Sequence, residues 1–410
     1  MNPLPSLPDR CEVLVVGAGP AGSACAQWLA RHGVDVLLVD AQTFPRDKTC
    51  GDGLIPDAHA ALARLGVLDE VMARAQPVRH VRCIGPSGRG IDVPGTLAVL
   101  PRRELDAIVC RAAVDAGARF FAPARFEAPL EDAAGRVIGA RLKTADGPRE
   151  VQAGWVVLAT GAVPQAMMAA GLCERRTPSG VALRGYVKND AMTGRITELD
   201  VVWHRKLKGG YGWIFPCGDG VFNIGAGMLS SHDIVDGKAS MQDTNLRDLF
   251  AAFTAVYPPA RELMDGGTVV GELKGAPLRC SLEGARYSRP GLIATGEAVG
   301  STYSFTGEGI GKALETGLLA AEALVDGRRQ ASDEAAVRSA YEARLKALKP
   351  KFDLYEKGNK VNAHPWLADL LIWRARKSER LLRRMAGVLN ETSNPGQLVT
   401  ARGLLKLFTE

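Results

Sequence analysis

The chain has 410 residues, more than one compact hydrophobic core usually holds, which predicts two or three domains. Hydrophobic residues make up 46% and charged residues 23%, as in ordinary soluble proteins, and no apolar run is long enough to cross a bilayer. The net charge of +6 is mild and comes without a recognition motif for nucleic acid, so we expect no nucleic-acid partner.

The start of the chain and its cysteines both indicate a cytoplasmic protein. Residues 1–10 are polar and rich in proline, without the basic start and apolar run of a secretory signal. The eight cysteines are scattered and form no C-x-x-C pair, which argues against a zinc site and a disulfide framework. We therefore expect reduced thiols and no bound metal.

The first third of the chain predicts alternating strands and helices. An apolar run at 12–16, a helical pattern at 21–32 and a second apolar run at 36–39 make a strand–helix–strand unit. The elements expected next are a helix at 56–65, strands and turns of another layer at 78–100, and a helix at 104–116.

The rest of the chain predicts two further regions of different character. Runs at 137–144 and 150–153 predict a hairpin that leads into an apolar strand at 155–159. Short alternating runs from 178 to 284 predict an antiparallel sheet that carries a substrate pocket. The remaining expected elements are a helix at 243–263, a strand at 291–295, a helix at 309–325 and a helical region at 333–410.

A glycine-rich turn follows the first predicted strand. Gly17, Gly19 and Gly22 form G-x-G-x-x-G: the first allows a tight turn, the second lets the backbone approach a pyrophosphate, and the third lets the helix pack on the strand. Asp40 closes the second strand, where a carboxylate holds ribose hydroxyls of FAD or NAD. The alternative is a turn without a ligand. The residues assigned to this end of a dinucleotide are Gly17, Gly19, Pro20, Ala21, Gly22, Asp40 and Ala41.

A second glycine-rich segment lies near residue 300. Gly296 and Glu297 resemble the strand-end motif of FAD enzymes, usually written G-D-A, whose carboxylate binds the ribityl chain. The amides of the turn at 307–310 would face the N1/O2 edge of isoalloxazine and stabilise reduced flavin. Because both turns fit one ligand, we predict FAD. The residues assigned to its flavin end are Gly296, Glu297, Gly307, Glu308, Gly309 and Ile310.

Two shorter signals agree with FAD. The apolar strand at 155–159 ends in A-T-G, with Gly161 as its glycine, as in many flavoproteins with two dinucleotide folds. Arg102 begins an R-x-x-L-D pattern that places an arginine near the FAD phosphates or ribose. Its neighbour Arg103 is the competing candidate for that role.

Four segments resemble the geranylgeranyl reductase family, within the wider class of p-hydroxybenzoate hydroxylase and the flavin halogenases. They are 17–22, 45–53 with K-x-C-G, 211–216 with Y-x-W-x-F-P, and 304–311. The resemblance implies an α/β fold with a Rossmann-like FAD-binding domain, an inserted antiparallel β-sheet substrate domain and a C-terminal helical region. The predicted boundaries are 1–75, 100–177 and 285–332 for the first, 76–99 and 178–284 for the second, and 333–410 for the third.

The resemblance also implies roles for single residues. Arg46, Cys50 and Gly51 would join the FAD site. Cys50 would assist protonation or shape the pocket, the alternative being a structural cysteine. The residues expected to contact a hydrophobic substrate are Tyr211, Trp213, Phe215 and Phe305, and those expected to act in catalysis are Cys50, Tyr211 and Trp213.

Two features of the aromatic strand leave questions open. Three aromatic side chains on one face of a strand can also belong to an ordinary core, which remains an equal alternative to a substrate wall. Lys208 stands where the family often has proline, which leaves the identity of the substrate open.

The motifs favour reduction over oxygenation. Flavin hydroxylases carry D-G-x-x-S-x-x-R after the A-x-G strand, and residues 160–167 lack its Asp and Arg. Flavin halogenases carry W-x-W-x-I-P, whereas residues 211–216 read Y-G-W-I-F-P. We expect saturation of C=C bonds in an isoprenoid or similarly hydrophobic substrate, by hydride transfer from N5 of reduced flavin. The alternative is a flavin-dependent monooxygenase or halogenase acting on a small aromatic or hydrophobic metabolite.

Partners follow from this chemistry and from the end of the chain. The electron donor is expected to be NAD(P)H, ferredoxin or a separate reductase. Residues 374–384 are strongly basic and follow an apolar stretch at 366–373. A solvated basic helix face is the favoured interpretation, and peripheral contact with the inner face of a membrane is the alternative.

Overall fold

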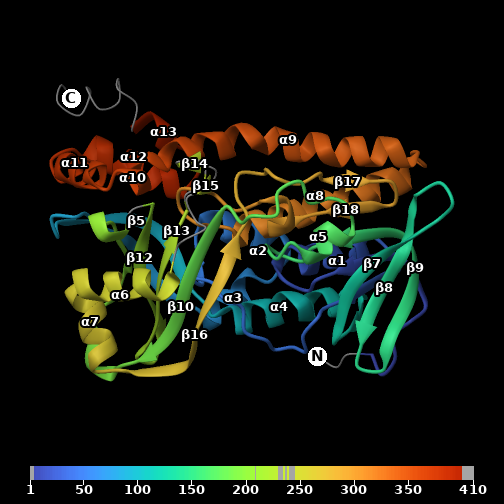
Figure 1. Cartoon of the computed structure of the whole chain (residues 1–410), viewed down its shortest axis with the longest axis horizontal. Helices are drawn as coiled ribbons and strands as arrows, with labels where there is room; N and C mark the ends of the chain where they lie inside the picture. Colours follow the sequence, from blue (N-terminus) through green and yellow to red (C-terminus); the bar gives the residue numbers. More distant parts are fainter. Residues whose placement is uncertain (1–3, 208, 230–233, 236–237, 240–244, 399–410) are drawn as a thin grey trace.

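The computed structural model describes residues 4–207, 209–229, 234–235, 238–239 and 245–398. In this part of the chain the strands form two eight-stranded sheets and a short two-stranded ribbon, with helices packed between and above them (Figure 1). Each of the eight cysteines is free of a disulfide. No helix in the described ranges combines the length and the apolar content needed to cross a membrane.

The first sheet is built on the amino-terminal strands, in the order β17-β18-β9-β1-β2-β6, and β8 joins β9 to β7. Strands β1, β2, β6, β9 and β18 pair in parallel, and their valine and leucine side chains are buried on both faces, as in a covered parallel sheet. The strands are β1 (Arg10–Val16), β2 (Val36–Val39), β6 (Arg119–Phe121), β7 (Ala124–Glu131), β8 (Val137–Thr144), β9 (Gly147–Leu158), β17 (Ser288–Arg289) and β18 (Leu292–Ala294).

The second sheet has the order β16-β10-β13-β12-β11-β4-β5-β3. It is antiparallel except where β4 and β11 pair in parallel, because β11 enters the sheet from a distant part of the chain rather than through a hairpin. The strands are β3 (Gly53–Leu54), β4 (Gln76–Ile84), β5 (Gly90–Val99), β10 (Gly180–Lys188), β11 (Leu199–Val202), β12 (Gly210–Gly218), β13 (Val221–Met228) and β16 (Thr268–Leu278), and the ribbon is β14 (Ile234–Val235) and β15 (Lys238–Ala239).

The helices join the two sheets. Helices α1 and α8 pack so closely that a Cβ atom on Gly317 would lie 2.1 Å from the carbonyl oxygen of Ala21. Helices α10, α11 and α12 stand over β4, β5 and β12 of the second sheet, while α9 runs along the top of the molecule (Figure 1). The helices are α1 (Pro20–Arg31), α2 (Pro56–Arg64), α3 (Leu68–Arg74), α4 (Arg102–Asp115), α5 (Gln165–Ala169), α6 (Leu246–Val256), α7 (Pro258–Asp265), α8 (Ile310–Arg329), α9 (Glu334–Gly358), α10 (Lys360–Ala363), α11 (Trp366–Ala375), α12 (Glu379–Leu389) and α13 (Pro395–Leu398).

Three expectations differ from the structure. The expected separate strands at 150–153 and 155–159 form one strand, β9, whose first half pairs with β8 and whose second half pairs with β1. The expected helix at 243–263 is two helices, because Pro258 cannot donate a hydrogen bond to α6 and instead begins α7. The expected antiparallel sheet is mixed at β4 and β11.

Some sequence predictions concern residues that the structure does not describe. Lys208, residues 243–244 and the end of the predicted helical region at 399–410 lie outside the described residues. The division of the chain into domains at the boundaries given above stays a prediction.

Candidate active site

The glycine turn after β1 is shaped to receive a dinucleotide phosphate. Gly17 has φ +102, and a Cβ atom on Gly22 would lie 1.8 Å from the carbonyl oxygen of Gly17. Helix α1 begins directly after Gly19, whose position as N-cap leaves the first N–H groups without a side-chain partner. These N–H groups and the positive end of the helix dipole form an anion site.

Two arginine side chains flank this turn. A Cβ atom on Gly19 would lie 3.5 Å from Nη2 of Arg46 and 3.8 Å from Nη2 of Arg102. Asp106 holds both guanidinium groups, accepting from Nε of Arg102 at 2.6 Å and from Nη1 of Arg46 at 3.0 Å. Arg103, the competing candidate, is exposed on the other side of α4. The site therefore presents fixed positive charge where a pyrophosphate would lie, and its residues fit FAD.

Asp40 closes β2 beside the same turn. Its side chain is buried, and it accepts hydrogen bonds from N–H of Ala18 at 2.8 Å and from N–H of Gln42 at 2.9 Å. A carboxylate offers about four acceptor positions, so two bonds to the backbone leave capacity for ribose hydroxyls. The protein thus fixes the carboxylate before a ligand arrives.

A cavity of about 840 Å³ connects the turn to the second sheet. Of the predicted cofactor residues, Gly22 and Gly296 do not border it: Gly22 packs on Gly17, and Gly296 packs on Ala21. The predicted residues that border the cavity are Gly17, Gly19, Pro20, Ala21, Asp40, Ala41, Arg46, Cys50, Gly51, Arg102, Gly161, Tyr211, Trp213, Phe215, Glu297, Phe305, Gly307, Glu308, Gly309 and Ile310.

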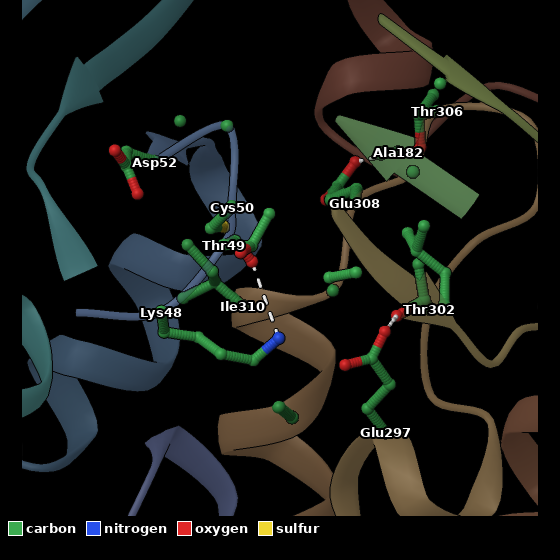
Figure 2. A pocket seen from close by; sticks show the side chains of 18 of the residues that line it. Lys48, Thr49, Cys50, Asp52, Ala182, Glu297, Thr302, Thr306, Glu308 and Ile310 are labelled. Atoms are coloured by element: carbon green, nitrogen blue, oxygen red, sulfur yellow. Dashed lines mark hydrogen bonds between the residues drawn. The ribbon is translucent and has the colours of Figure 1, made fainter. Parts of the chain in front are cut away.

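The predicted flavin end forms one wall of this cavity. Glu297 accepts a hydrogen bond from Oγ1 of Thr302 at 3.3 Å, which restrains the glutamate that replaces the usual aspartate (Figure 2). Gly309 is the N-cap of α8 and carries no side-chain cap, so the first amides of this helix are also available to a ligand. Tyr211 donates a hydrogen bond from its hydroxyl to the carbonyl of Thr306, which joins β12 to this turn.

The loop with Cys50 lies opposite this wall in Figure 2 and is held by the second sheet. Nη2 of Arg184 lies 2.6 Å from Oδ1 of Asp47 and donates to the carbonyl of Lys48 at 2.9 Å. Nδ2 of Asn223 donates to the carbonyl of Cys50 at 2.7 Å. Burial raises the pKa of the Cys50 thiol, so the thiol keeps its proton at neutral pH.

Asp52, two residues after Cys50, extends this hydrogen-bond network. It accepts hydrogen bonds from Tyr186 at 2.5 Å and from Asn223 at 2.7 Å, and burial raises its pKa to about 6. Arg184 and Asn223 belong to none of the sequence motifs. A signal for both was present, because each is a polar residue in the middle of an apolar strand, which folding tolerates only when the side chain finds partners.

Trp203, which follows β11, and the aromatic side chains of β12 form a row along the cavity. Ring centroids lie 6.0 Å apart for Trp203 and Tyr211, 6.2 Å for Tyr211 and Trp213, and 6.4 Å for Trp213 and Phe215. Nε1 of Trp213 donates to Oδ1 of Asn223 at 2.9 Å, which fixes the indole. The segment with K-x-C-G therefore contacts the segment with Y-x-W-x-F-P: a Cβ atom on Gly51 would lie 3.2 Å from the ring of Phe215.

Beyond the aromatic row the cavity becomes apolar and is closed by the C-terminal helices. Trp203 and Phe305 border the transition. The side chains that line this far part are Val81, Cys83, Val93, Leu199, Val201, Leu371, Ile372, Met385 and Leu389. One end of the cavity is thus suited to a charged dinucleotide and the other to a hydrophobic chain.

Comparisons with known proteins identify the family to which the chain belongs. The family described as FAD binding domain matches residues 10–210. Menaquinone reductase of Mycolicibacterium smegmatis is 36% identical over 335 residues, which cover 78% of this chain and 77% of that protein. The chain belongs to the geranylgeranyl reductase-like family of FAD-dependent oxidoreductases. The predictions of family, of FAD as cofactor and of an oxidoreductase are therefore confirmed.

Two further proteins are similar to this geranylgeranyl reductase-like chain at lower sequence identity. Digeranylgeranylglycerophospholipid reductase 1 of Methanopyrus kandleri is 29% identical, over 81% of this chain and 85% of that protein. A geranylgeranyl bacteriochlorophyll reductase-like structure from Thermoplasma acidophilum superposes with a TM-score of 0.72 at 22% identity, covering 98% of this chain and 96% of that one. The structural likeness confirms the predicted α/β fold class.

Proposed function

We propose that this oxidoreductase saturates a C=C bond in the prenyl chain of a hydrophobic lipid. The observation that carries the proposal is the single cavity that joins the FAD turns to an apolar chamber. A prenyl chain has no polar group with which to orient itself, so its position must come from the shape of apolar walls. The row from Trp203 to Phe215 and the side chains of α11 and α12 supply such walls.

A prenylated quinone is the substrate class that we favour. The name of the M. smegmatis relative, at 36% identity, supports a quinone lipid, and the name of the M. kandleri relative supports a prenylated glycerophospholipid. Both classes share a long isoprenoid tail, which the apolar chamber would take. The polar head would remain nearer the cavity mouth.

FAD would supply, in its reduced form, the hydride that an isolated alkene needs. The protein does the rest: Arg46 and Arg102 bind the phosphates, Glu297 and the turn at 307–310 hold the flavin end, and the aromatic row excludes water. Tyr211 and Trp213 would fix the alkene against the flavin. Cys50 would shape the pocket or assist protonation, because its thiol remains protonated.

An anaerobic single turnover tests this function. The reduced holoenzyme is mixed with menaquinone in detergent, and flavin oxidation is followed by absorbance while the lipid is analysed by mass spectrometry. We expect oxidation without oxygen and a lipid that gains two hydrogens in its tail. Oxidation that occurs only with oxygen and yields a hydroxylated or halogenated product would support a monooxygenase or halogenase instead.

Cys50→Ala and Cys50→Ser separate the two roles of the thiol. If Cys50 assists protonation, both variants keep their FAD and oxidise more slowly with menaquinone. If Cys50 shapes the pocket, the near-isosteric Cys50→Ser variant keeps most of the rate. Normal turnover and normal FAD content in Cys50→Ala would remove Cys50 from the mechanism.

The electron donor and the membrane contact belong to the same proposal. NAD(P)H, ferredoxin or a separate reductase would reduce the cofactor. A membrane would deliver the lipid along α11, which has Leu371 and Ile372 on the cavity side and the exposed rings of Trp366 and Trp373 elsewhere on its surface. Basic side chains follow these rings in α11 and α12, as expected for contact with anionic lipid.

A further inference from the structure

A buried group of charged side chains adjoins the flavin end of the cavity. One carboxylate oxygen each from Asp57, Glu308 and Glu391 lie within 4.8 Å of one another. Glu308 belongs to the turn that borders the cavity, whereas Asp57 lies behind it at the start of α2. The three residues come from segments far apart in the sequence, so the fold brings them together.

Two members of the group have oxygens without a hydrogen-bond partner. Both carboxylate oxygens of Asp57 are buried and accept no hydrogen bond, and its side chain is 7% exposed. Oε1 of Glu308 is buried and unpartnered in the same way, while its Oε2 faces the hydroxyl of Thr306 at 3.4 Å. Leaving such oxygens bare is unfavourable, because each has lost its hydrogen bonds with water. A proton between the two carboxyl groups satisfies one oxygen of each.

The positive charge in the group is already fixed by lysine. Nζ of Lys312 lies 2.7 Å from Glu391, 2.6 Å from Glu315 and 3.6 Å from Asp57, and its side chain is 3% exposed. Lys351 lies 2.6 Å from the other oxygen of Glu391, and Tyr303 donates to Glu391 at 2.8 Å. The two lysines therefore face three carboxylates, those of Glu391, Glu315 and Asp57, and among the described residues Glu308 forms no ion pair of its own with them.

The surroundings decide which carboxyl carries the proton. Burial, followed by the charge of Asp57, raises the pKa of Glu308 well above its ordinary value. Burial also raises the pKa of Asp57, but nearby Lys312 limits the rise to about 6. Asp57 also lies beside the first turn of α8, where a Cβ atom on Gly311 would be 2.2 Å from its Oδ2. At neutral pH Asp57 is the anion, and Glu308 is the acid.

We propose that Glu308 holds the proton that alkene reduction consumes and that Asp57 shares and replaces it. The inference rests on the proposed function for its substrate. In the step, one alkene carbon gains a hydride from the reduced cofactor and the other gains the proton of Glu308. Two C–H bonds form, the O–H bond of Glu308 breaks, and the cofactor is oxidised by two electrons. Glu308 then regains a proton from solvent by way of Asp57.

Infrared spectroscopy tests the shared proton without any substrate. The protein at neutral pH should show the C=O band of a protonated carboxyl, which shifts in D₂O and is missing in Glu308→Gln. The matched control Glu315→Gln alters a more exposed glutamate of the same group and should keep the band. Absence of the band from the unmodified protein would overturn the proposal, whatever the substrate proves to be.

Single-turnover rates test the delivery of the proton. With menaquinone, Glu308→Gln should retain FAD and oxidise at least about a hundredfold more slowly, since general acids contribute roughly 10²–10⁴-fold. The rate of the unmodified enzyme should fall as alkaline pH removes the proton of Glu308. Asp57→Asn removes the charge that raises the pKa of Glu308, so this fall should move to lower pH. The proposal is wrong if Glu308→Gln reacts within twofold of the unmodified enzyme, or if Asp57→Asn leaves the pH profile in place.

The two measurements separate the possible failures. A carboxyl band that behaves as expected, together with an enzyme that reduces none of the prenyl lipids, contradicts the proposed substrate and leaves the proton pair standing. Reduction of menaquinone without the carboxyl band contradicts the proton pair and leaves the proposed function standing.

Discussion

Arg102 and Arg103 are adjacent in the sequence, yet only Arg102 faces the glycine turn. Arg102 is buried and bonded to Asp106 through two nitrogens, at 2.6 and 2.9 Å, whereas Arg103 is exposed. The difference comes from helix α4, which turns successive side chains about 100° apart. A single residue step therefore separates an arginine beside the glycine turn from a solvated one.

Arg102→Lys tests this contact. Lysine keeps the charge but cannot hold the fork geometry, so we expect the Kd of FAD to rise about tenfold to a hundredfold, equivalent to roughly 1.5–3 kcal/mol. Fluorescence quenching of FAD on titration into the apoprotein measures the effect. Arg103→Ala serves as the matched control and should leave the Kd unchanged; equal effects in the two variants would contradict the assignment.

At the scale of elements, the glycine turns could be predicted from local sequence patterns. Contacts between residues far apart in the sequence could not. The strand–turn–helix unit with Gly17 follows from adjacent residues, so its position could be predicted. Nothing near Asn223 in the sequence reveals that it bonds to Cys50 and Trp213, because those partners arrive from other strands. The pairing of Glu308 with Asp57 was missed for the same reason.

Helix α11 has apolar side chains both on its cavity side and on its exposed surface. Its predicted continuation into the basic stretch is broken at Ser378, which caps α12 by accepting from N–H of Leu381. Leu371 and Ile372 border the cavity, while the side chain of Trp366 is 56% exposed and that of Trp373 is 37% exposed. A helix with apolar residues on both sides is typical of one that contacts a second apolar phase.

Replacing both exposed tryptophans tests the membrane contact. We expect Trp366→Ala with Trp373→Ala to bind anionic vesicles at least about tenfold more weakly, because each ring would bury apolar area in the interface. Vesicle co-sedimentation measures binding, and the FAD content checks the fold. As a control, Val269→Ala with Val270→Ala alters exposed apolar side chains on β16 and should bind vesicles normally. An equal loss of binding in both double variants would indicate nonspecific hydrophobic adsorption and contradict a specific role of the two tryptophans.

For the whole molecule, burial of carboxylates makes stability depend on pH. Asp200 is buried, accepts from Tyr257 at 2.7 Å and has its pKa raised by burial to about 6. The folded state thus binds a proton that the unfolded chain has already released. Stability from this group is complete at acid pH and is lost as pH rises through about 6.

Asp200→Asn removes this dependence while keeping an oxygen for Tyr257. Relative to the unmodified protein, the variant should gain about 1–2 kcal/mol in free energy of unfolding between pH 5 and pH 7.5, since one pKa unit corresponds to about 1.4 kcal/mol. Urea unfolding at a series of pH values gives the difference. A gap between the two proteins that stays constant across this range would show that Asp200 does not titrate there.

The close packing of α1 on α8 has a consequence for the order in which the protein is made. The two glycine turns that we predict to hold FAD are separated by 285 residues, from Gly22 to Gly307. At ribosomal speeds the first turn leaves the ribosome roughly 15 to 60 s before the second. The cofactor can be enclosed only after that delay. Until then the nascent chain must keep its first apolar strands from aggregating without the stabilisation that bound FAD would give. Scarcity of the cofactor in a growing cell would then act only after most of the chain has been synthesised.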